Sequence, residues 1–453
     1  MGVGKEMIEQ LDNSIPRKGW LVLSFVLVLG LMNSSFADSK KKKKEDTASE
    51  KPVSILDRMN KSKLVWPQPP NIARIKYLDL FAGEKLPDFS AKPAKQKVSW
   101  MDRVAGTSTD KTGDPLAGHF FMGEPHGLAV DSTGKLYVAD TKVGAIFIIN
   151  PETHDTEMIK NGKQANFAQI YGLAIDDTNR LFVSDGEAHR VLLFGPQHER
   201  VEAVIREGLM TPAGLAIDNE NRFLYVTDVA QDLVLVYDAD NLNLLRKMGT
   251  PGKGHTSNEK GDFAKPSGVA VDKDGNVYVA DMLNARIEIF DADGKFIRAI
   301  GRRGDGPGYF SMPKGVAVDC DGHIWVTDSM QNRLQVFSQE GDLLIYIGNV
   351  QGILPGMFSG LQYVTIDNNN RVFTSEVFPG RVQEYRYVTQ EEARQEYQRR
   401  EAEKKSTESK PAPAAQPAAP ASPQPPNDKS DAKTKDSAAK SPQTSLAAPQ
   451  GSQ

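Results

Sequence analysis

Short runs of β-forming residues, separated by polar turns, fill the middle of the chain from Pro125 to about residue 388. In one representative stretch, PSGVAVD ends at Asp272, VYVAD ends at Asp281 after a turn containing Asp and Gly, and RIEIF starts at Arg286. Apolar runs of this length joined by a tight Asp/Gly turn, with a third run close behind, are typical of an antiparallel meander. The pattern therefore predicts an all-β region.

The same pattern recurs six times. The first run of each unit ends in an aspartate, at intervals of 45, 42, 54, 47 and 48 residues: Asp131, Asp176, Asp218, Asp272, Asp319 and Asp367. The second runs are LYVAD, LFVSD, LYVTD, VYVAD, IWVTD and VFTSE, and weaker fourth runs such as FIRAIG close the complete units. Four antiparallel strands repeated at this period describe the blade of a β-propeller.

These residues resemble the NHL-repeat family from Pro125 to about Val388. The family signature is a Pro-x-Gly run ending in Asp, followed by a Tyr-Val-(Ala/Thr)-Asp run; the second unit lacks the Pro, and the sixth lacks both Pro and Gly. The resemblance implies a six-bladed β-propeller of four-stranded antiparallel blades. The sixth unit has no fourth run, and residues 72–81 (IARIKYLDLF) read like one. We expect this N-terminal strand to close the ring, because closure removes an exposed sheet edge.

The flanking segments differ in composition from the repeats. Residues 1–37 have an apolar run after Arg17 and Lys18 and small residues before Asp38, which predicts a signal peptide, with an uncleaved membrane anchor as the alternative. Residues 38–67 read as a Lys-rich disordered tether, 68–390 as the propeller, 391–405 as a charged helical segment, and 406–453 as a disordered Pro/Ala/Ser/Lys-rich tail. The prediction is a periplasmic or secreted protein.

Charge argues against a nucleic-acid partner. Residues 121–388 hold 25 Lys or Arg and 36 Asp or Glu, a net charge of −11, which repels phosphate, although Arg302, Arg303 and Lys314 form a local basic group. The single cysteine, Cys320, excludes an intramolecular disulfide, and we expect it to be buried.

Most charged residues of the repeat have an architectural interpretation. One aspartate per blade at the strand–turn junction (131, 176, 218, 272, 319, 367) predicts turn capping. A second set (Asp140, Asp185, Asp228, Asp281, Asp328) stands opposite arginines that start the third runs (Arg190, Arg286, Arg333, Arg381), which predicts structural ion pairs rather than catalytic carboxylates.

Candidate functional residues are those that differ between blades at the channel mouth. The position before the motif glycine holds His126, Tyr171, Ala213, Ser267, Lys314 and Gln362. A relative within the family, the peptide-amidating lyase, holds a catalytic zinc with three histidines. Here only His126 occupies the ring, and the other six histidines are scattered, so no metal site and no cofactor are expected.

The sequence thus favours an exported, non-catalytic, monomeric propeller that binds a protein, a peptide or another polar ligand through the mouth residues His126, Tyr171, Ser267, Lys314 and Gln362. Two alternatives stay open: an envelope enzyme of the lyase or lactonase type, and an extracytoplasmic sensor module. Contact with a membrane is expected only through an uncleaved N-terminal segment.

Overall fold

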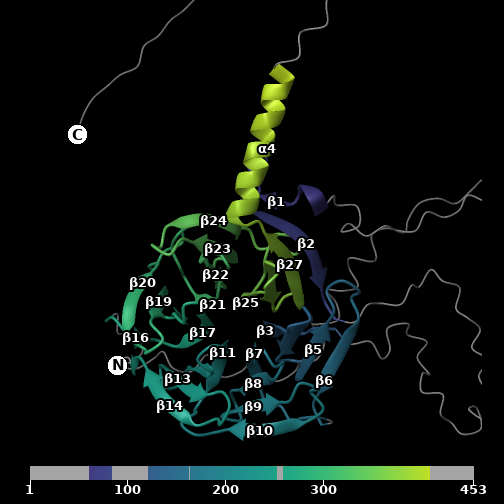
Figure 1. The fold of residues 1–453 in the computed structure, drawn as a ribbon. Coiled ribbons are helices and arrows are strands. Elements are labelled where there is room, and N and C mark those ends of the chain that lie inside the picture. The colour runs from purple at the N-terminus through teal and green to yellow at the C-terminus, as the bar shows by residue number, and fades with distance from the viewer. Residues whose placement is uncertain (1–60, 84–120, 163, 252–258, 409–453) are drawn as a thin grey trace, which may run out of the picture. The chain divides into compact units, whose positions relative to one another are not determined.

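Six blades surround a central channel in the computed structural model, which describes residues 61–83, 121–162, 164–251 and 259–408. In each blade the first strand lies next to the channel and the fourth lies at the rim (Figure 1). The first strands of neighbouring blades contact one another around the whole ring, including those of blades six and one. The predicted six-bladed β-propeller is confirmed.

The bounds of the strands follow the repeat. Blade one contains β3 (Pro125–Val130), β4 (Leu136–Asp140), β5 (Ala145–Ile149) and β6 (Thr156–Lys160). Blade two contains β7 (Ile170–Ile175), β8 (Leu181–Asp185), β9 (Arg190–Phe194) and β10 (Val201–Ile205). Blade three contains β11 (Pro212–Asp218), β12 (Phe223–Asp228), β13 (Leu233–Asp238) and β14 (Leu244–Met248), and the short parallel pair β15 (Thr250–Pro251) and β16 (Asp262–Phe263) leads to blade four.

The other three blades repeat this order. Blade four contains β17 (Pro266–Val271), β18 (Val277–Asp281), β19 (Arg286–Phe290) and β20 (Phe296–Ile300). Blade five contains β21 (Pro313–Val318), β22 (Ile324–Asp328), β23 (Arg333–Phe337) and β24 (Leu343–Gly348). Blade six contains β25 (Leu361–Ile366), β26 (Arg371–Glu376) and β27 (Arg381–Tyr387), with β2 (Ile75–Phe81) and β1 (Val65–Trp66) from the N-terminal side.

Burial explains why the runs differ in pattern. The second and third strands, such as LYVAD and AIFII of blade one, are buried along their whole length because each blade packs between two others. The outer strands, such as FIRAI of blade four, alternate between buried or half-buried and exposed positions because their other face meets water. The core consequently divides into six clusters, for example the cluster in which Phe81 and Val382 of blade six meet Leu128 and Phe147 of blade one.

The closing strand is confirmed. β2 pairs antiparallel with β27, from Ile75 opposite Tyr387 to Phe81 opposite Val382. The predicted tether is wrong at its C-terminal end, since a 3-10 turn, η1 (Lys61–Lys63), and β1 already belong to the fold. β1 adds a fifth strand to blade six, and the ring of Trp66 packs edge-on against Tyr385 at 6.0 Å. The apolar pair Val65 and Trp66 provides this packing at the end of a polar segment.

A single α-helix of the described chain, α4 (Gln390–Glu408), follows blade six (Figure 1). Thr389 and Glu392 form a capping box, in which the Glu392 amide donates to Thr389 Oγ1 at 3.2 Å and the Thr389 amide donates to Glu392 Oε2 at 2.9 Å. The helix extends three residues into the segment predicted as a disordered tail. Within the described ranges, no helix combines the length and apolar character needed to cross a membrane. The predicted signal peptide (1–37), most of the tether and residues 409–453 lie outside the described residues.

Candidate functional site

The candidate site is the end of the channel at which the six inner strands begin, which we call the mouth face. The mouth ring consists of the six residues that precede the motif glycine position: His126, Tyr171, Ala213, Ser267, Lys314 and Gln362. Two pairs of side chains in the ring meet directly. The rings of His126 and Tyr171 pack edge-on at 5.5 Å, and Lys314 Nζ donates to Gln362 Oε1 at 2.6 Å.

The other ring positions serve the framework more than the channel. Ser267 is buried, and its hydroxyl donates to the carbonyl oxygen of Lys314 at 2.8 Å. Gln362 is also buried, and its amide nitrogen donates to the carbonyl oxygen of Gly360 at 2.9 Å. Ala213 is buried and offers no polar group. The side chains available to a ligand at the mouth are therefore His126, Tyr171 and Lys314, with the amide oxygen of Gln362 already bonded to Lys314.

Hydroxyl groups of the second strands fix the ring backbone, a feature that the sequence reasoning missed. Thr327 Oγ1 accepts the amide of Gly315 at 2.8 Å and donates to the carbonyl oxygen of Gln362 in the next blade at 2.5 Å. Three other blades use the same bridge, through Ser184, Thr227 and Ser375. The signal in the sequence is the Ala/Ser/Thr position that precedes the final acid of the second run. Each hydroxyl joins two blades at the mouth.

The second set of acids anchors the segment that leads into each inner strand. Asp228, for example, accepts the amides of Met210 and Thr211 before β11 and those of Ala230 and Gln231 in the turn after β12. The expected arginine pairs join Arg190 to Asp185, Arg286 to Asp281, and Arg381 to Glu376, each at 2.9 Å.

Arg333 departs from the expected pairing in blade five. Its guanidinium donates to the carbonyl oxygen of Asp305 at 2.7 Å and to the side chains of Gln331 and Asn349. Asp328, which was expected to pair with it, instead accepts backbone amides on both sides, from Ser311 and from Gln331. The long connector between blades five and six supplies the Asn349 partner, so this arginine binds the connector instead of the carboxylate.

The turn aspartates at the opposite end of the inner strands have their oxygens engaged in the turns. Asp272 Oδ1 accepts the amides of Asp274 and Asn276, both at 2.9 Å, and Asp272 Oδ2 accepts the Tyr278 hydroxyl at 2.8 Å. Asp131, Asp176, Asp218, Asp319 and Asp367 accept turn amides in the same way. This geometry is that of a structural cap.

Between the two ends, the channel has a waist formed by the motif glycines of blades one to five. A Cβ atom at Gly172 would lie 2.1 Å from the carbonyl oxygen of Ala213, so only glycine lets these strands approach so closely. Blade six has Tyr363 at this position. The Tyr363 hydroxyl reaches across the channel to 3.5 Å from the carbonyl oxygen of Ser267 in blade four, at the limit of a hydrogen bond. Tyr363 therefore fills the waist.

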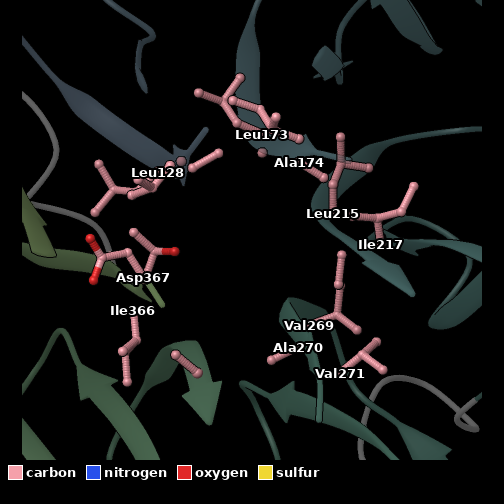
Figure 2. A pocket seen from close by; sticks show the side chains of 18 of the residues that line it. Leu128, Leu173, Ala174, Leu215, Ile217, Val269, Ala270, Val271, Ile366 and Asp367 are labelled. Carbon is pink, nitrogen blue, oxygen red and sulfur yellow. The ribbon is translucent and has the colours of Figure 1, made fainter. Parts of the chain in front are cut away.

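A cavity of about 420 Å³ occupies the channel on the other side of Tyr363 (Figure 2). Its wall repeats an apolar triplet from five of the six inner strands, such as Leu173, Ala174 and Ile175, whereas blade six contributes Thr365 and Tyr363. Asp131, Asp176 and Asp367 stand at its outer rim. No residue of the mouth ring lines this cavity. The mouth ring and the cavity are thus lined by different residues, and the polar side chains that vary between blades at the mouth do not reach the cavity.

The mouth has an unusual charge balance. Burial lowers the pKa of the Lys314 ammonium. Burial, with a smaller contribution from the positive charge of Lys314, lowers the pKa of His126 from 6.5 to about 4, so its imidazole is neutral at pH 7. Burial also raises the pKa of Tyr171, and the nearby carboxylate of Glu187 adds to this. The ring therefore combines a neutral imidazole and a neutral phenol with the side chain of Lys314, and the carboxylate of Glu187 lies near Tyr171.

The residues at the mouth do not fit a catalytic zinc such as the one in the related peptide-amidating lyase. Zinc needs about three His, Cys or carboxylate ligands, whereas His126 shares the ring with a lysine, a serine, an alanine, a tyrosine and a glutamine. Among the described residues, no three or more His, Cys, Asp or Glu side chains form a group that could hold a metal ion. His119 and His255 lie outside the described residues.

Cys320 is exposed, so the expectation of a buried thiol is wrong. It follows Asp319 in the turn between β21 and β22, and turns of this kind lie at the surface. Its thiol lies 3.1 Å from Asn370 Oδ1.

Three family models match parts of the chain. Residues 258–410 match a "6-bladed beta-propeller" family, residues 184–302 match an "SMP-30/Gluconolactonase/LRE-like region", and residues 122–149 match an NHL repeat. A curated relative, the probable peptidyl-alpha-hydroxyglycine alpha-amidating lyase pgal-1 of Caenorhabditis elegans, is 38% identical over 93 residues. That match covers 20% of this chain and 25% of the relative.

The solved structures that the chain resembles are more distant in sequence. A gluconolactonase from Xanthomonas campestris is 18% identical, with a TM-score of 0.45 over 59% of this chain and 86% of that one. A virginiamycin B lyase from Staphylococcus aureus is 13% identical, with a TM-score of 0.44 over 59% of this chain and 96% of that one. Six sequence repeats, six blades around a channel and the matching family models lead to one conclusion: the chain is a six-bladed β-propeller whose first blade matches an NHL repeat.

Proposed function

We propose that this propeller is an exported, non-catalytic scaffold that docks a protein or peptide through its mouth face. The observation that carries the proposal is a group of exposed apolar side chains in turns and a connector of blades five and six, at the end of the blades where the inner strands begin. This apolar patch consists of Met330, Val350, Ile353, Leu354 and Phe378, which are between 40% and 67% exposed. Exposed apolar groups beside a polar centre are typical of interaction sites on soluble proteins.

Hydrogen bonds hold the segments of the apolar patch together. The connector from Asn349 to Gly360 carries three of its residues and runs between the turn of Met330 and the turn of Phe378. The Gly360 amide donates to Asn332 Oδ1 at 2.9 Å, and the Phe378 amide donates to the carbonyl oxygen of Ser359 at 3.3 Å. Arg381 donates to the carbonyl oxygen of Ile353. The patch therefore rests on anchored backbone and covers blades five and six, which also supply Lys314 and Gln362.

The experiment is affinity capture with the purified chain from an envelope extract of the cells that produce it. The patch variant carries Met330→Glu and Ile353→Glu, and the matched control carries Leu245→Glu and Ile297→Glu, two exposed outer-strand positions of similar apolar character. We expect one partner to be retained by the wild type and the control, and its affinity for the patch variant to fall at least about tenfold. Equal recovery by all three proteins would remove the mouth face as the docking surface. The intact mass of the chain from the same extract tests export, with Asp38 as the expected first residue.

An enzymatic function of the lyase or lactonase type is the second candidate. It is favoured by the 93-residue match to an amidating lyase and by the SMP-30/gluconolactonase-like match. Turnover of a peptidyl-α-hydroxyglycine or of gluconolactone by the purified chain, in the presence of zinc or calcium and abolished by His126→Ala, would replace the scaffold proposal with this one.

A further inference from the structure

The mouth ring holds hydrogen-bond donors that the protein itself does not satisfy. The Lys314 ammonium carries three N–H groups and uses one of them, in the 2.6 Å bond to Gln362 Oε1. No ion pair within the described part of the chain involves Lys314, and burial is the only cause that lowers its pKa. A half-buried cation without a carboxylate partner has lost part of its hydration, so an anion that reaches the mouth would be stabilised next to it.

Two further groups at the mouth have free hydrogen-bonding capacity. The Tyr171 hydroxyl and the His126 imidazole have no hydrogen-bond partner among the residues described, although the two rings pack against each other at 5.5 Å. Lys314 is close enough to His126 for its charge to lower the imidazole's pKa. Tyr363 fills the waist below them, so a ligand group that enters from the mouth face stops at these donors.

The donors match an acceptor-only group of single negative charge. A carboxylate accepts several hydrogen bonds and donates none, and one ammonium balances its charge. A phosphate dianion would bring a second negative charge into a domain that is already strongly acidic and would find only one cation in the ring. The apolar patch lies on blades five and six, which also supply Lys314 and Gln362. It can pack against an apolar segment of a ligand that carries the charged group.

We propose that the mouth ring binds the carboxylate of an apolar peptide, held by the Lys314 ammonium and the Tyr171 hydroxyl, with the rest of the peptide on the apolar patch. This inference rests on the proposed function and names the chemistry of its partner. The proposed source of the carboxylate is the C-terminus of the peptide, and an Asp or Glu side chain, which shares the same recognition chemistry, is the alternative that the test separates from it.

The test follows the His126 imidazole by NMR while probes are added to the full chain. The probes are sodium acetate, inorganic phosphate, acetyl-Leu-Phe-Val with a free C-terminal carboxylate, the same peptide as its C-terminal amide, and acetyl-Leu-Glu-Val amide. We expect the free-acid peptide to bind at least about tenfold more tightly than its amide. Its binding should raise the pKa of His126 from the value of about 4 in the free protein, because the bound anion offsets the charge of Lys314. We expect the Glu-containing amide to bind more weakly than the free-acid peptide, and equal binding of the two would overturn the C-terminus as the source of the carboxylate.

Lys314→Met removes the charge while keeping an unbranched side chain, and Lys295→Met at an exposed turn is the control. The Lys314 variant should keep its melting temperature, since it relieves a buried charge, and should lose the tenfold preference for the free acid. Four outcomes would each overturn the inference. They are equal binding of acid and amide, equal binding by wild type and Lys314→Met, tighter binding of phosphate than of acetate, and the absence of any response at His126. If acetate perturbs His126 through Lys314 while the patch variant captures the same partners as the wild type, the carboxylate site stands and the docking proposal fails.

Discussion

Glu288 occupies, in blade four, the position that Gln335 and Gln383 occupy in blades five and six. Gln335 accepts the Gly308 amide at 2.8 Å and donates to the carbonyl oxygen of Tyr309 at 2.9 Å, and so binds the connector from both sides. Glu288 accepts the corresponding amide, from Gly261, at 3.2 Å, but its Oε2 atom is buried without a hydrogen-bond partner. Burial raises the pKa of Glu288 to about 7, despite the nearby Arg286.

The substitution Glu288→Gln should therefore stabilise the propeller at pH 8, by about 1 to 3 kcal/mol, because it removes a buried charge and restores the donor present in blades five and six. The folded pKa of Glu288 lies above its unfolded value near 4.5, so the folded state binds more protons between these values, and stability is lost as the pH rises from 4.5 through 7. The gain from the substitution should disappear at pH 4.5. Urea unfolding at both pH values measures it.

Glu152→Gln, at an exposed turn, is the control and should leave the free energy of unfolding within about 0.5 kcal/mol of the wild type at both pH values. Glu384, whose pKa burial also raises to about 7, is present in all three proteins and cancels in the comparison. A Glu288→Gln variant that is less stable than the wild type at pH 8 would show that the ion pair with Arg286, at 3.1 Å, outweighs the burial of the carboxylate.

At the scale of the element, the second strand of a blade connects the inner strands of its own blade and the next. Thr327 in β22 satisfies two buried backbone groups, the Gly315 amide at 2.8 Å and the Gln362 carbonyl oxygen at 2.5 Å. Gly315 directly follows Lys314, and the carbonyl oxygen belongs to Gln362 itself. The Thr327 hydroxyl therefore fixes the backbone of the two residues whose side chains meet at the mouth. Blades one and four have Ala139 and Ala280 at this position.

Thr327→Val keeps the shape of the side chain and removes the hydroxyl, which leaves a buried N–H and a buried C=O without their partner. We expect a loss of about 1 to 3 kcal/mol in the free energy of unfolding. Thr327→Ser retains the hydroxyl and should recover most of that loss, as Ser184 does in blade two. Chemical denaturation measures the free energy of unfolding of both variants. A larger loss for Ser than for Val would show that the methyl packing of Thr327 matters more than the hydrogen bonds of its hydroxyl.

The strands were predictable from the sequence because each one repeats a local signal six times: a proline at the start of most inner strands, a turn aspartate and a run of β-branched or aromatic residues. The exceptions depend on non-local partners. Arg333 binds the blade-five connector instead of Asp328, and Val65 and Trp66 join the fold because Tyr385, more than 300 positions away, offers a packing surface. No local pattern in the sequence encodes either partner.

At the scale of the whole molecule, the sequence predicts the closed ring of six blades better than it predicts the surfaces that could bind a partner. The mouth ring could be located because its residues vary within a constant motif. The absence of the motif glycine in blade six was visible too, but the position of the Tyr363 hydroxyl across the channel depends on the geometry of the closed ring. The apolar patch comes from connector and turn residues that follow no repeat, so only the structure brings Met330, Ile353 and Phe378 to one face.

Closure of the ring depends on one strand from the N-terminal side of the chain. Phe81 in β2 is 3% exposed and packs between blades six and one, with Phe147 and Phe373 in the same cluster. Leu78 in the same strand is 36% exposed. Without β2 the strand β27 would form an open sheet edge, which favours pairing with another molecule.

Phe81→Ala should therefore lower the free energy of unfolding by about 3 to 5 kcal/mol, because it leaves a cavity where the last blade meets the first. Leu78→Ala, in the same strand and with a similar side-chain truncation on the solvent side, should change it by less than about 1 kcal/mol. Guanidinium unfolding followed by far-UV circular dichroism measures both, and size-exclusion chromatography below the transition shows whether the weakened closure lets chains associate through the β27 edge. Equal, small effects of the two substitutions would mean that the packing of Phe81 between the last blade and the first contributes little to the stability of this propeller.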